Sequence, residues 1–212
     1  MSFMKYENVV WDWNGTLLDD VRVSVGAINR MLERRGMPGL TVERYRDIFG
    51  FPVRDYYESI GFDFARDDWD GVSREFVQDY DALATDVQLT EGVRPVLERL
   101  KEEGKRLYVL SALQEDLLLG MLERFGIRDY FEGICGAVDI YASSKVDRGR
   151  ELVKARGIDP SKTLMVGDTL HDAEVAEALG FDVCLFAGGH NSAWRLREKG
   201  LVIERLSELL SL

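Results

Sequence analysis

The chain has 212 residues, of which 46% are hydrophobic and 31% charged, proportions typical of a globular protein with one sizeable core. Its formal net charge of -11 argues against nucleic acid or an anionic membrane as a partner, because their phosphates attract positive charge. No apolar run approaches the roughly 20 residues that span a bilayer, and no signal-peptide pattern opens the sequence, so we expect a cytoplasmic protein.

The first predicted element is a short buried strand over residues 9–11, which ends at Asp12. A glycine-containing turn follows at once and holds Asn14, Gly15 and Thr16. Open α/β sheets bind their ligands at the carboxyl ends of their strands. Asp12 is therefore a candidate nucleophile or metal ligand.

Residues 20–88 show helical periodicity rather than strand signals. Apolar residues recur at three- and four-residue spacing in four stretches that begin near positions 21, 41, 52 and 69. We predict a helical cap over residues 20–88, inserted into a single α/β core that comprises residues 1–19 and 89–212.

From residue 89 onward, short apolar runs alternate with helical patterns. The runs at 107–110, 133–138, 163–166, 181–186 and 201–203 predict strands. Such alternation implies right-handed βαβ units, so we predict an α/β fold with a doubly wound, mostly parallel sheet and helices on both faces.

Polar residues follow the second, third and fourth of these predicted strands, counted from residue 9. They are Ser111; then Asp139, Ser143, Ser144 and Lys145; then Asp168 and Asp172. The carboxyl ends of parallel strands share one edge of the sheet, so these side chains can converge on Asp12.

The converging groups predict a phosphoryl-transfer site. Crowded carboxylates repel one another, a divalent cation relieves the repulsion, and an oxygen-only ligand set suits Mg²⁺. An anion would find donors in the hydroxyl of Ser111, the ammonium of Lys145 and the backbone amides of Gly15, Thr16 and Ala112. A carboxylate nucleophile beside such donors is suited to phosphoryl transfer.

Four motifs in this order resemble those of the haloacid dehalogenase-like superfamily. They are Asp-x-x-Gly-Thr-Leu from Asp12, a hydrophobic strand ending in Ser111, Lys145, and Gly-Asp-Thr-x-x-Asp from residue 167. The resemblance covers nearly the whole chain, includes the insertion of the helical-cap branch, and is greatest to the phosphoglycolate-phosphatase-like group. It implies a Rossmann-like core and a Mg²⁺-dependent phosphatase that acts on a small phosphorylated metabolite.

The resemblance also implies roles for particular residues. Asp12 would attack phosphorus and form an aspartyl-phosphate, while Ser111 and Lys145 would hold the phosphoryl oxygens. Lys145 is preferred to the nearby Lys154 and Lys162 because it follows a strand and opens a helix. The metal ligands would be Asp12, the main-chain carbonyl of Asn14, Asp168 and, directly or through water, Asp172.

Asn14 departs from the phosphatase pattern of this family, which has an aspartate there that protonates the leaving group and then activates water. An amide does neither, and general acid–base catalysis contributes about 10²–10⁴-fold. Three interpretations stay open. The substrate has a good leaving group, such as an acyl phosphate; another group compensates, with His171 nearest in sequence; or the chain is a weak phosphatase or a regulatory protein that binds a phosphate ligand. A sugar-phosphate mutase is less favoured, because it needs that carboxylate even more.

A few residues have weaker assignments. Arg54 follows a loop-to-helix turn in the predicted cap and is a candidate to bind an acidic substrate. Ser111 and Asp172 also fit structural roles, as a helix N-cap and a first-turn carboxylate. We expect His171 to be exposed or to support the site indirectly, and His190 to be an ordinary loop residue.

Overall fold

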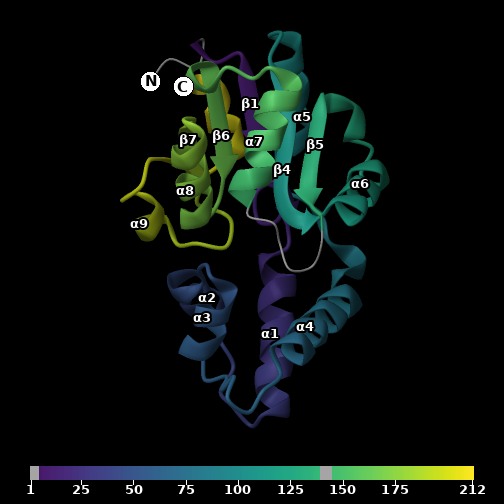
Figure 1. Ribbon diagram of the computed structural model, residues 1–212, viewed down its shortest axis with the longest axis vertical. Coiled ribbons are helices and arrows are strands. Elements are labelled where there is room, and N and C mark those ends of the chain that lie inside the picture. The colour runs from purple at the N-terminus through teal and green to yellow at the C-terminus, as the bar shows by residue number, and fades with distance from the viewer. Residues whose placement is uncertain (1–4, 139–144) are drawn as a thin grey trace.

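The computed structural model describes residues 5–138 and 145–212 (Figure 1). Asp139, Ser143 and Ser144, which the sequence places after the third predicted strand, lie outside these residues. Within the described part, no helix combines the length and the apolar character that crossing a bilayer requires.

A six-stranded parallel sheet forms the centre of the fold, in the spatial order β5-β4-β1-β6-β7-β8. β1 lies between β4 and β6, with Val10 opposite Tyr108 on one side and Met165 on the other. The chain extends the sheet from β1 through β4 to β5 and then crosses back to β6, which confirms the predicted doubly wound topology. The strands are β1 (Asn8–Trp11), β4 (Arg106–Gln114), β5 (Gly133–Ala137), β6 (Thr163–Gly167), β7 (Asp182–Phe186) and β8 (Leu201–Ile203).

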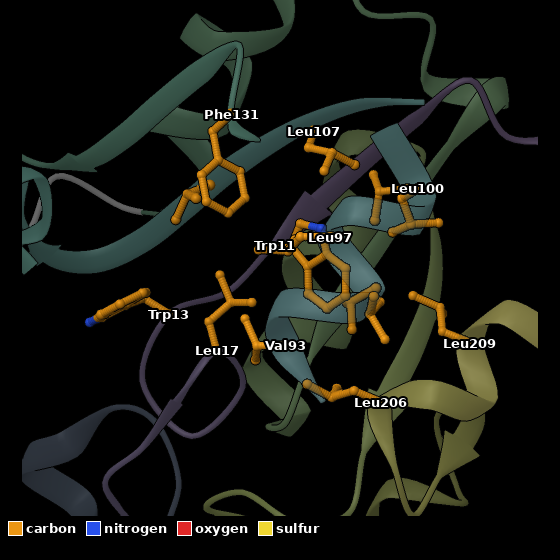
Figure 2. Packing of buried hydrophobic residues seen from close by; sticks show 14 of the residues in the cluster. Trp11, Trp13, Leu17, Val93, Leu97, Leu100, Leu107, Phe131, Leu206 and Leu209 are labelled. Carbon is orange, nitrogen blue, oxygen red and sulfur yellow. The ribbon is translucent and has the colours of Figure 1, made fainter. Parts of the chain in front are cut away.

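Helices cover both faces of the sheet because successive side chains of a strand point to opposite faces. Trp11 belongs with Leu97 and Leu100 of α5 to one apolar cluster (Figure 2). Val10 belongs to the cluster on the other face, with Val175 of α8. The covering elements are α5 (Val93–Glu102), α6 (Glu115–Arg124), α7 (Lys145–Arg156), α8 (Leu170–Leu179), the short α9 (Ala193–Leu196) and a C-terminal 3₁₀ turn (Leu206–Ser211).

Four helices between β2 (Leu18–Asp19) and β3 (Gln88–Leu89) form a separate layer, which we call the helical unit. They are α1 (Val21–Arg34), α2 (Val42–Ile48), α3 (Val53–Ser59) and α4 (Trp69–Leu83). They match the four predicted helical stretches. Their buried residues, including Ile28, Met31 and Val72, form a cluster of their own. Figure 1 shows the helical unit at the end of the sheet toward which the arrowheads of β4 and β5 point.

Hydrogen bonds join α2 to the loop after β7. Arg46 Nε donates to the carbonyl of Gly189 at 2.7 Å. The carbonyl of Phe49 accepts from Asn191 Nδ2 at 2.9 Å and from Arg195 Nη1 at 2.7 Å. This loop therefore connects the helical unit to the carboxyl edge of the sheet.

Two local features differ from the sequence-based expectation. β2 (Leu18–Asp19) and β3 (Gln88–Leu89) form a short antiparallel pair where the chain enters and leaves the helical unit. Two-residue strands are too short to show an alternating pattern. β4 also continues through Ser111, and α6 begins only at Glu115, so Ser111 is a strand residue and not a helix N-cap.

Candidate active site

Asp12 lies at the carboxyl end of β1, where the strand order reverses. Its amide donates to the carbonyl of Val166 on β6 at 2.9 Å, which fixes the backbone just beyond the strand. Lys145, the first residue of α7, places Nζ 2.5 Å from Asp12 Oδ1 and 2.7 Å from Asp172 Oδ1. Residues more than a hundred positions apart thus meet at the predicted edge.

Asp12, Asp168 and Asp172 each offer a carboxylate oxygen within 4.8 Å of the other two. Burial raises the pKa of Asp12 well above its ordinary range; Lys145 opposes this rise, and the two neighbouring carboxylates add to it. Burial likewise raises the pKa of Asp168 to about 6. For Asp172, the effect of burial is outweighed by Lys145, and the pKa lies below its ordinary value. Three buried carboxylates beside one lysine form an oxygen donor set that fits Mg²⁺.

Asp168 is held by the turn after β1 and by the loop after β7. Thr16 Oγ1 donates to Asp168 Oδ1 at 2.7 Å, and the amide of His190 donates to Oδ2 at 2.6 Å. Gly15 has φ +75°, and a Cβ there would lie 2.3 Å from Asp168 Oδ2, so the close approach requires glycine. These contacts fix the position of the carboxylate, one oxygen of which lies within 4.8 Å of those of Asp12 and Asp172.

The backbone amides of Gly15 and Thr16, which the sequence suggests as donors to a substrate, make hydrogen bonds within or next to their own turn. The amide of Gly15 donates to Asp20 Oδ1 at 2.7 Å and to the carbonyl of Leu18 at 2.9 Å. The amide of Thr16 donates to the carbonyl of Trp13 at 3.3 Å. These bonds close the turn and use the amides that were expected to face an anion. Both residues also contact Asp168, Thr16 through its hydroxyl and Gly15 through close packing.

Asp172 has a structural and a chemical role at the same time. Its Oδ2 accepts from Thr169 Oγ1 at 2.7 Å, from the amide of Thr169 at 2.9 Å and from the amide of Asp168 at 3.1 Å. Thr169 Oγ1 in turn accepts from the amide of Asp172, which completes a capping box for α8. Because Oδ1 binds Lys145, donors surround both carboxylate oxygens.

A cavity of about 400 Å³ lies between this cluster and the helical unit. Asp12, Ser111, Ala112, Lys145 and Asp172 line its floor. Ser111 Oγ accepts from the amide of Leu113 at 3.0 Å, which orients the hydroxyl and leaves its hydrogen for a ligand. The floor therefore brings together the candidate nucleophile, a hydroxyl donor and a cation.

Arg54 lies outside this group. Its Nε is 3.3 Å from Glu58 Oε1, and its guanidinium lies 4.8 Å from the centroid of the Phe64 ring. With Glu58, Phe62 and Phe64 it lines a separate hollow on the helical unit. The loop-to-helix turn alone did not show that the side chain of Arg54 points away from the cavity. It does so because Glu58, one helical turn further along α3, is its ion-pair partner.

Asn14 belongs to a buried polar cluster that the sequence patterns did not reveal. Its Nδ2 donates to Asp20 Oδ2 at 2.9 Å, and Tyr80 OH donates to the same oxygen at 2.8 Å. His190 Nε2 lies 3.2 Å from Asp20 Oδ1, and Tyr45 OH lies 2.9 Å from His190 Nδ1. All five side chains line the cavity. Burial opposes the ionised form of Asp20, but His190 and the donors of Asn14 and Tyr80 hold its pKa below the ordinary value.

His190 is thus a buried, paired side chain and not the ordinary loop residue that we expected. Burial disfavours the imidazolium, yet Asp20 raises the pKa of His190 from 6.5 to about 9. His171 differs from it. The ring of His171 stacks on Phe51 with 4.5 Å between centroids, and its Nδ1 lies 3.2 Å from Glu174 Oε2. These contacts make His171 part of the cavity wall.

The His190–Asp20 pair leads to a pH-dependent stability. The pKa of His190 is higher in the folded than in the unfolded chain. The pair therefore contributes its full free energy of stabilisation below about pH 6.5, and this contribution is lost as the pH rises through about 9. We expect the free energy of unfolding to fall over this window by on the order of 3 kcal/mol. Urea unfolding at successive pH values measures it, and His190→Gln should lack the decline. His171→Gln is the matched control; equal stability of the parent chain at both ends of the window would refute the expectation.

The chain is similar to known proteins along most of its length. A family model described as haloacid dehalogenase-like hydrolase matches residues 9–186. The tyrosine-protein kinase PtkA of Mycobacterium tuberculosis is 31% identical over 193 residues, which cover 87% of this chain and 63% of that protein. The phosphoglycolate phosphatase of Chromobacterium violaceum is 29% identical over 220 aligned positions, which cover 100% of this chain and 98% of that one. A solved structure of the M. tuberculosis kinase superimposes with a TM-score of 0.79 at 26% identity and covers 97% of both chains. The chain spans 63% of the length of its curated mycobacterial relatives.

Proposed function

This chain belongs to the haloacid dehalogenase-like hydrolase family, and from that premise we propose that it is a Mg²⁺-dependent phosphatase that hydrolyses a small phosphorylated metabolite through an aspartyl-phosphate on Asp12. The observation that carries the proposal is the placement of the Asp12 carboxylate. It lies on the cavity floor, 2.5 Å from Lys145 Nζ and within 4.8 Å of the carboxylate oxygens of Asp168 and Asp172.

The donor set supports Mg²⁺ as the cofactor. We assign Asp12, Asp168 and the main-chain carbonyl of Asn14 as direct ligands. Asp172 already accepts four hydrogen bonds, so we assign it a contact through water. Bound there, Mg²⁺ would offset the negative charge of the carboxylates and of the phosphoryl oxygens.

In the first step, an Asp12 carboxylate oxygen attacks phosphorus while the bond from phosphorus to the leaving oxygen breaks. The electron pair departs with the leaving group, and a carboxyl phosphate forms on Asp12. Lys145 and the Ser111 hydroxyl bind the phosphoryl oxygens as charge moves onto them. In the second step, water attacks the same phosphorus and the bond from phosphorus to Asp12 breaks. The electron pair returns to the Asp12 carboxylate, and the protons of the water leave with the phosphate product.

Asn14 supplies no proton at either step, so turnover is expected to be slow or confined to reactive substrates. The alternative is a catalytically weak, regulatory protein that binds a phosphate ligand. The named relatives also differ in activity, since one is a kinase and the other a phosphatase. We further propose that residues 20–88 act as a cap that closes over a core of residues 1–19 and 89–212 and excludes water.

Phosphate release from acetyl phosphate and from p-nitrophenyl phosphate, with and without Mg²⁺, tests the proposal. Mg²⁺ at about 100 times its Kd should stabilise the fold by about 2.7 kcal/mol and raise Tm by roughly 5–10 °C. Asp168→Asn should remove this shift, whereas Asp63→Asn, at an exposed position of the helical unit, should keep it. Beryllofluoride that binds tightly without any phosphate release would favour the regulatory alternative, and phosphate transfer from ATP to a tyrosine substrate would favour a kinase.

A further inference from the structure

We infer that the organic half of the substrate is an uncharged aromatic ring, so that the chain hydrolyses an aryl phosphomonoester. This inference rests on the proposed function and names the substrate class of that site. Two separate observations support it. Aromatic side chains line the cavity beside Asp12, and Asn14 has no carboxyl group that could protonate a leaving group.

The wall of the cavity is aromatic. Residues from α2 to α4 and the loop between α2 and α3 supply seven rings, namely Tyr45, Phe49, Phe51, Tyr56, Tyr57, Phe76 and Tyr80. Several of them meet edge to face, such as Phe49 with Phe51 at 5.6 Å and Phe49 with Tyr56 at 5.2 Å between centroids. Such arrays accept a further ring in the same geometry, each good contact contributing about 0.5–1.5 kcal/mol.

The cavity is large enough for such a ring. Its volume is about 400 Å³, whereas an apolar cavity of about 150 Å³ already binds benzene. The same cavity is lined by Asp12, Ser111 and Lys145, where the phosphoryl group would lie. A ring and a phosphoryl group therefore fit together.

The wall offers no cation to a carboxylated substrate. Among the described lining residues, Lys145 is the single lysine or arginine, and Asp12 and Asp172 already pair with it. The charge of His190 is paired with Asp20, and Asp81 adds a negative side chain to the lining. A carboxylate like that of phosphoglycolate would be desolvated there without a partner, which is costly.

None of the arginines of the helical unit is among the described residues that line the cavity. Arg35 pairs with Glu75 at 2.8 Å, Arg46 donates to the Gly189 carbonyl, and Arg54 pairs with Glu58. The wall thus selects for an apolar group and against an acidic one.

The chemistry of residue 14 points to the same class. A phenolic leaving group has a conjugate-acid pKa near 10, several units below that of an aliphatic alcohol. When the bond from phosphorus to the aryl oxygen breaks, the electron pair leaves on a phenolate that takes its proton from water. The step therefore needs little help from a general acid, and Asn14 supplies none.

Four substrates separate ring binding from leaving-group reactivity: phenyl phosphate, benzyl phosphate, acetyl phosphate and phosphoglycolate. We expect phenyl phosphate to have a kcat/KM about tenfold or more above that of phosphoglycolate. Benzyl phosphate, which keeps the ring on a poor leaving group, should match phenyl phosphate in KM and fall below it in kcat. Acetyl phosphate, which lacks the ring, should be turned over with a KM about tenfold higher.

Two variants of the wall sharpen the test. Phe51→Ala should raise the KM for phenyl phosphate about threefold to tenfold and leave the KM for acetyl phosphate unchanged. The ratio of the KM for acetyl phosphate to that for phenyl phosphate should therefore decrease. Phe64→Ala, at a phenylalanine of the helical unit outside the cavity, is the matched control. Val77→Arg places a cation at an exposed lining position and should raise kcat/KM for phosphoglycolate about tenfold or more.

The outcomes keep the two proposals apart. The aryl assignment is wrong if phosphoglycolate is turned over as fast as or faster than phenyl phosphate, or if substrates with and without a ring have the same KM. Either result leaves the proposed phosphatase function standing. No Mg²⁺-dependent release from any of the four substrates, acetyl phosphate included, defeats the proposed function itself.

Discussion

Asp12→Asn is expected to lower phosphate release to below detection, a loss on the order of 10⁶-fold, the scale seen when a covalent nucleophile is removed. The amide oxygen is too weak a nucleophile to form the carboxyl phosphate, although it can still accept from Lys145 Nζ. Lys145 also keeps Asp172 at 2.7 Å, so the fold should remain intact. Steady-state phosphate release, with Tm as the folding check, measures the effect.

The control is Asp182→Asn, an aspartate at the start of β7 that pairs with Lys5. Parallel strands place it at the opposite edge of the sheet, so it should leave turnover unchanged. Acid quenching during turnover should trap an acyl phosphate in the parent chain and not in Asp12→Asn. Retention of full activity by Asp12→Asn would remove Asp12 as the nucleophile and refute the mechanism.

Asn14→Asp is expected to raise kcat for benzyl phosphate by about 10²-fold or more, within the range of general acid–base catalysis. The structure adds a reason. Asn14 Nδ2 lies 2.9 Å from Asp20 Oδ2, so the new carboxyl group would share a site with a second carboxylate. Two carboxylates at this distance do not both ionise readily, and one then holds its proton near neutral pH, as a general acid must.

The gain should be smaller for phenyl phosphate, because its leaving group needs less help. Asn14→Ala is the control that removes the amide without adding a carboxyl group, and it should give no gain. Equal or lower turnover of benzyl phosphate by Asn14→Asp would show that a missing acid is not what limits the chain. The increase in kcat for benzyl phosphate, divided by the increase for phenyl phosphate, measures how far the reaction depends on protonation of the leaving group.

The sequence was sufficient for the features that repeat or that end strands. Apolar runs marked the core strands. Asp12, Ser111 and Asp168 directly follow such runs, which predicted that they share one edge of the sheet; Asp12 and Ser111 line one cavity, and Asp168 lies beside Asp12. This works because parallel topology turns sequence position into spatial position: residues at the carboxyl ends of strands must meet. Lys145 followed from the same rule.

The sequence was insufficient where a residue's role depends on its partner. His190 and Asp20 lie 170 positions apart and outside the helices and strands, so they belong to no periodic pattern of residues. No sequence pattern around either residue therefore predicts that they pair. The sequence indicates Gly15 as a turn residue whose amide could bind an anion. Whether that amide faces a ligand or a carboxylate of the protein depends on the position of Asp20. The direction of Arg54 depends on Glu58 and Phe64 in the same way. Side-chain direction is set by packing, which a pattern of residue types does not encode.

The bonds between α2 and the loop after β7 determine which side of the cavity can yield. Asn191 of that loop and Arg195 of α9 donate to the Phe49 carbonyl, and the His190 amide of the loop donates to Asp168. Tyr80 of α4 is bound to the same network, because its hydroxyl donates to Asp20, the partner of His190. Val77, one turn earlier on α4, is exposed where it lines the cavity. We expect substituents on the ring to be tolerated beside Val77 and not beside α2, so positional isomers of one compound should differ in how well they fit.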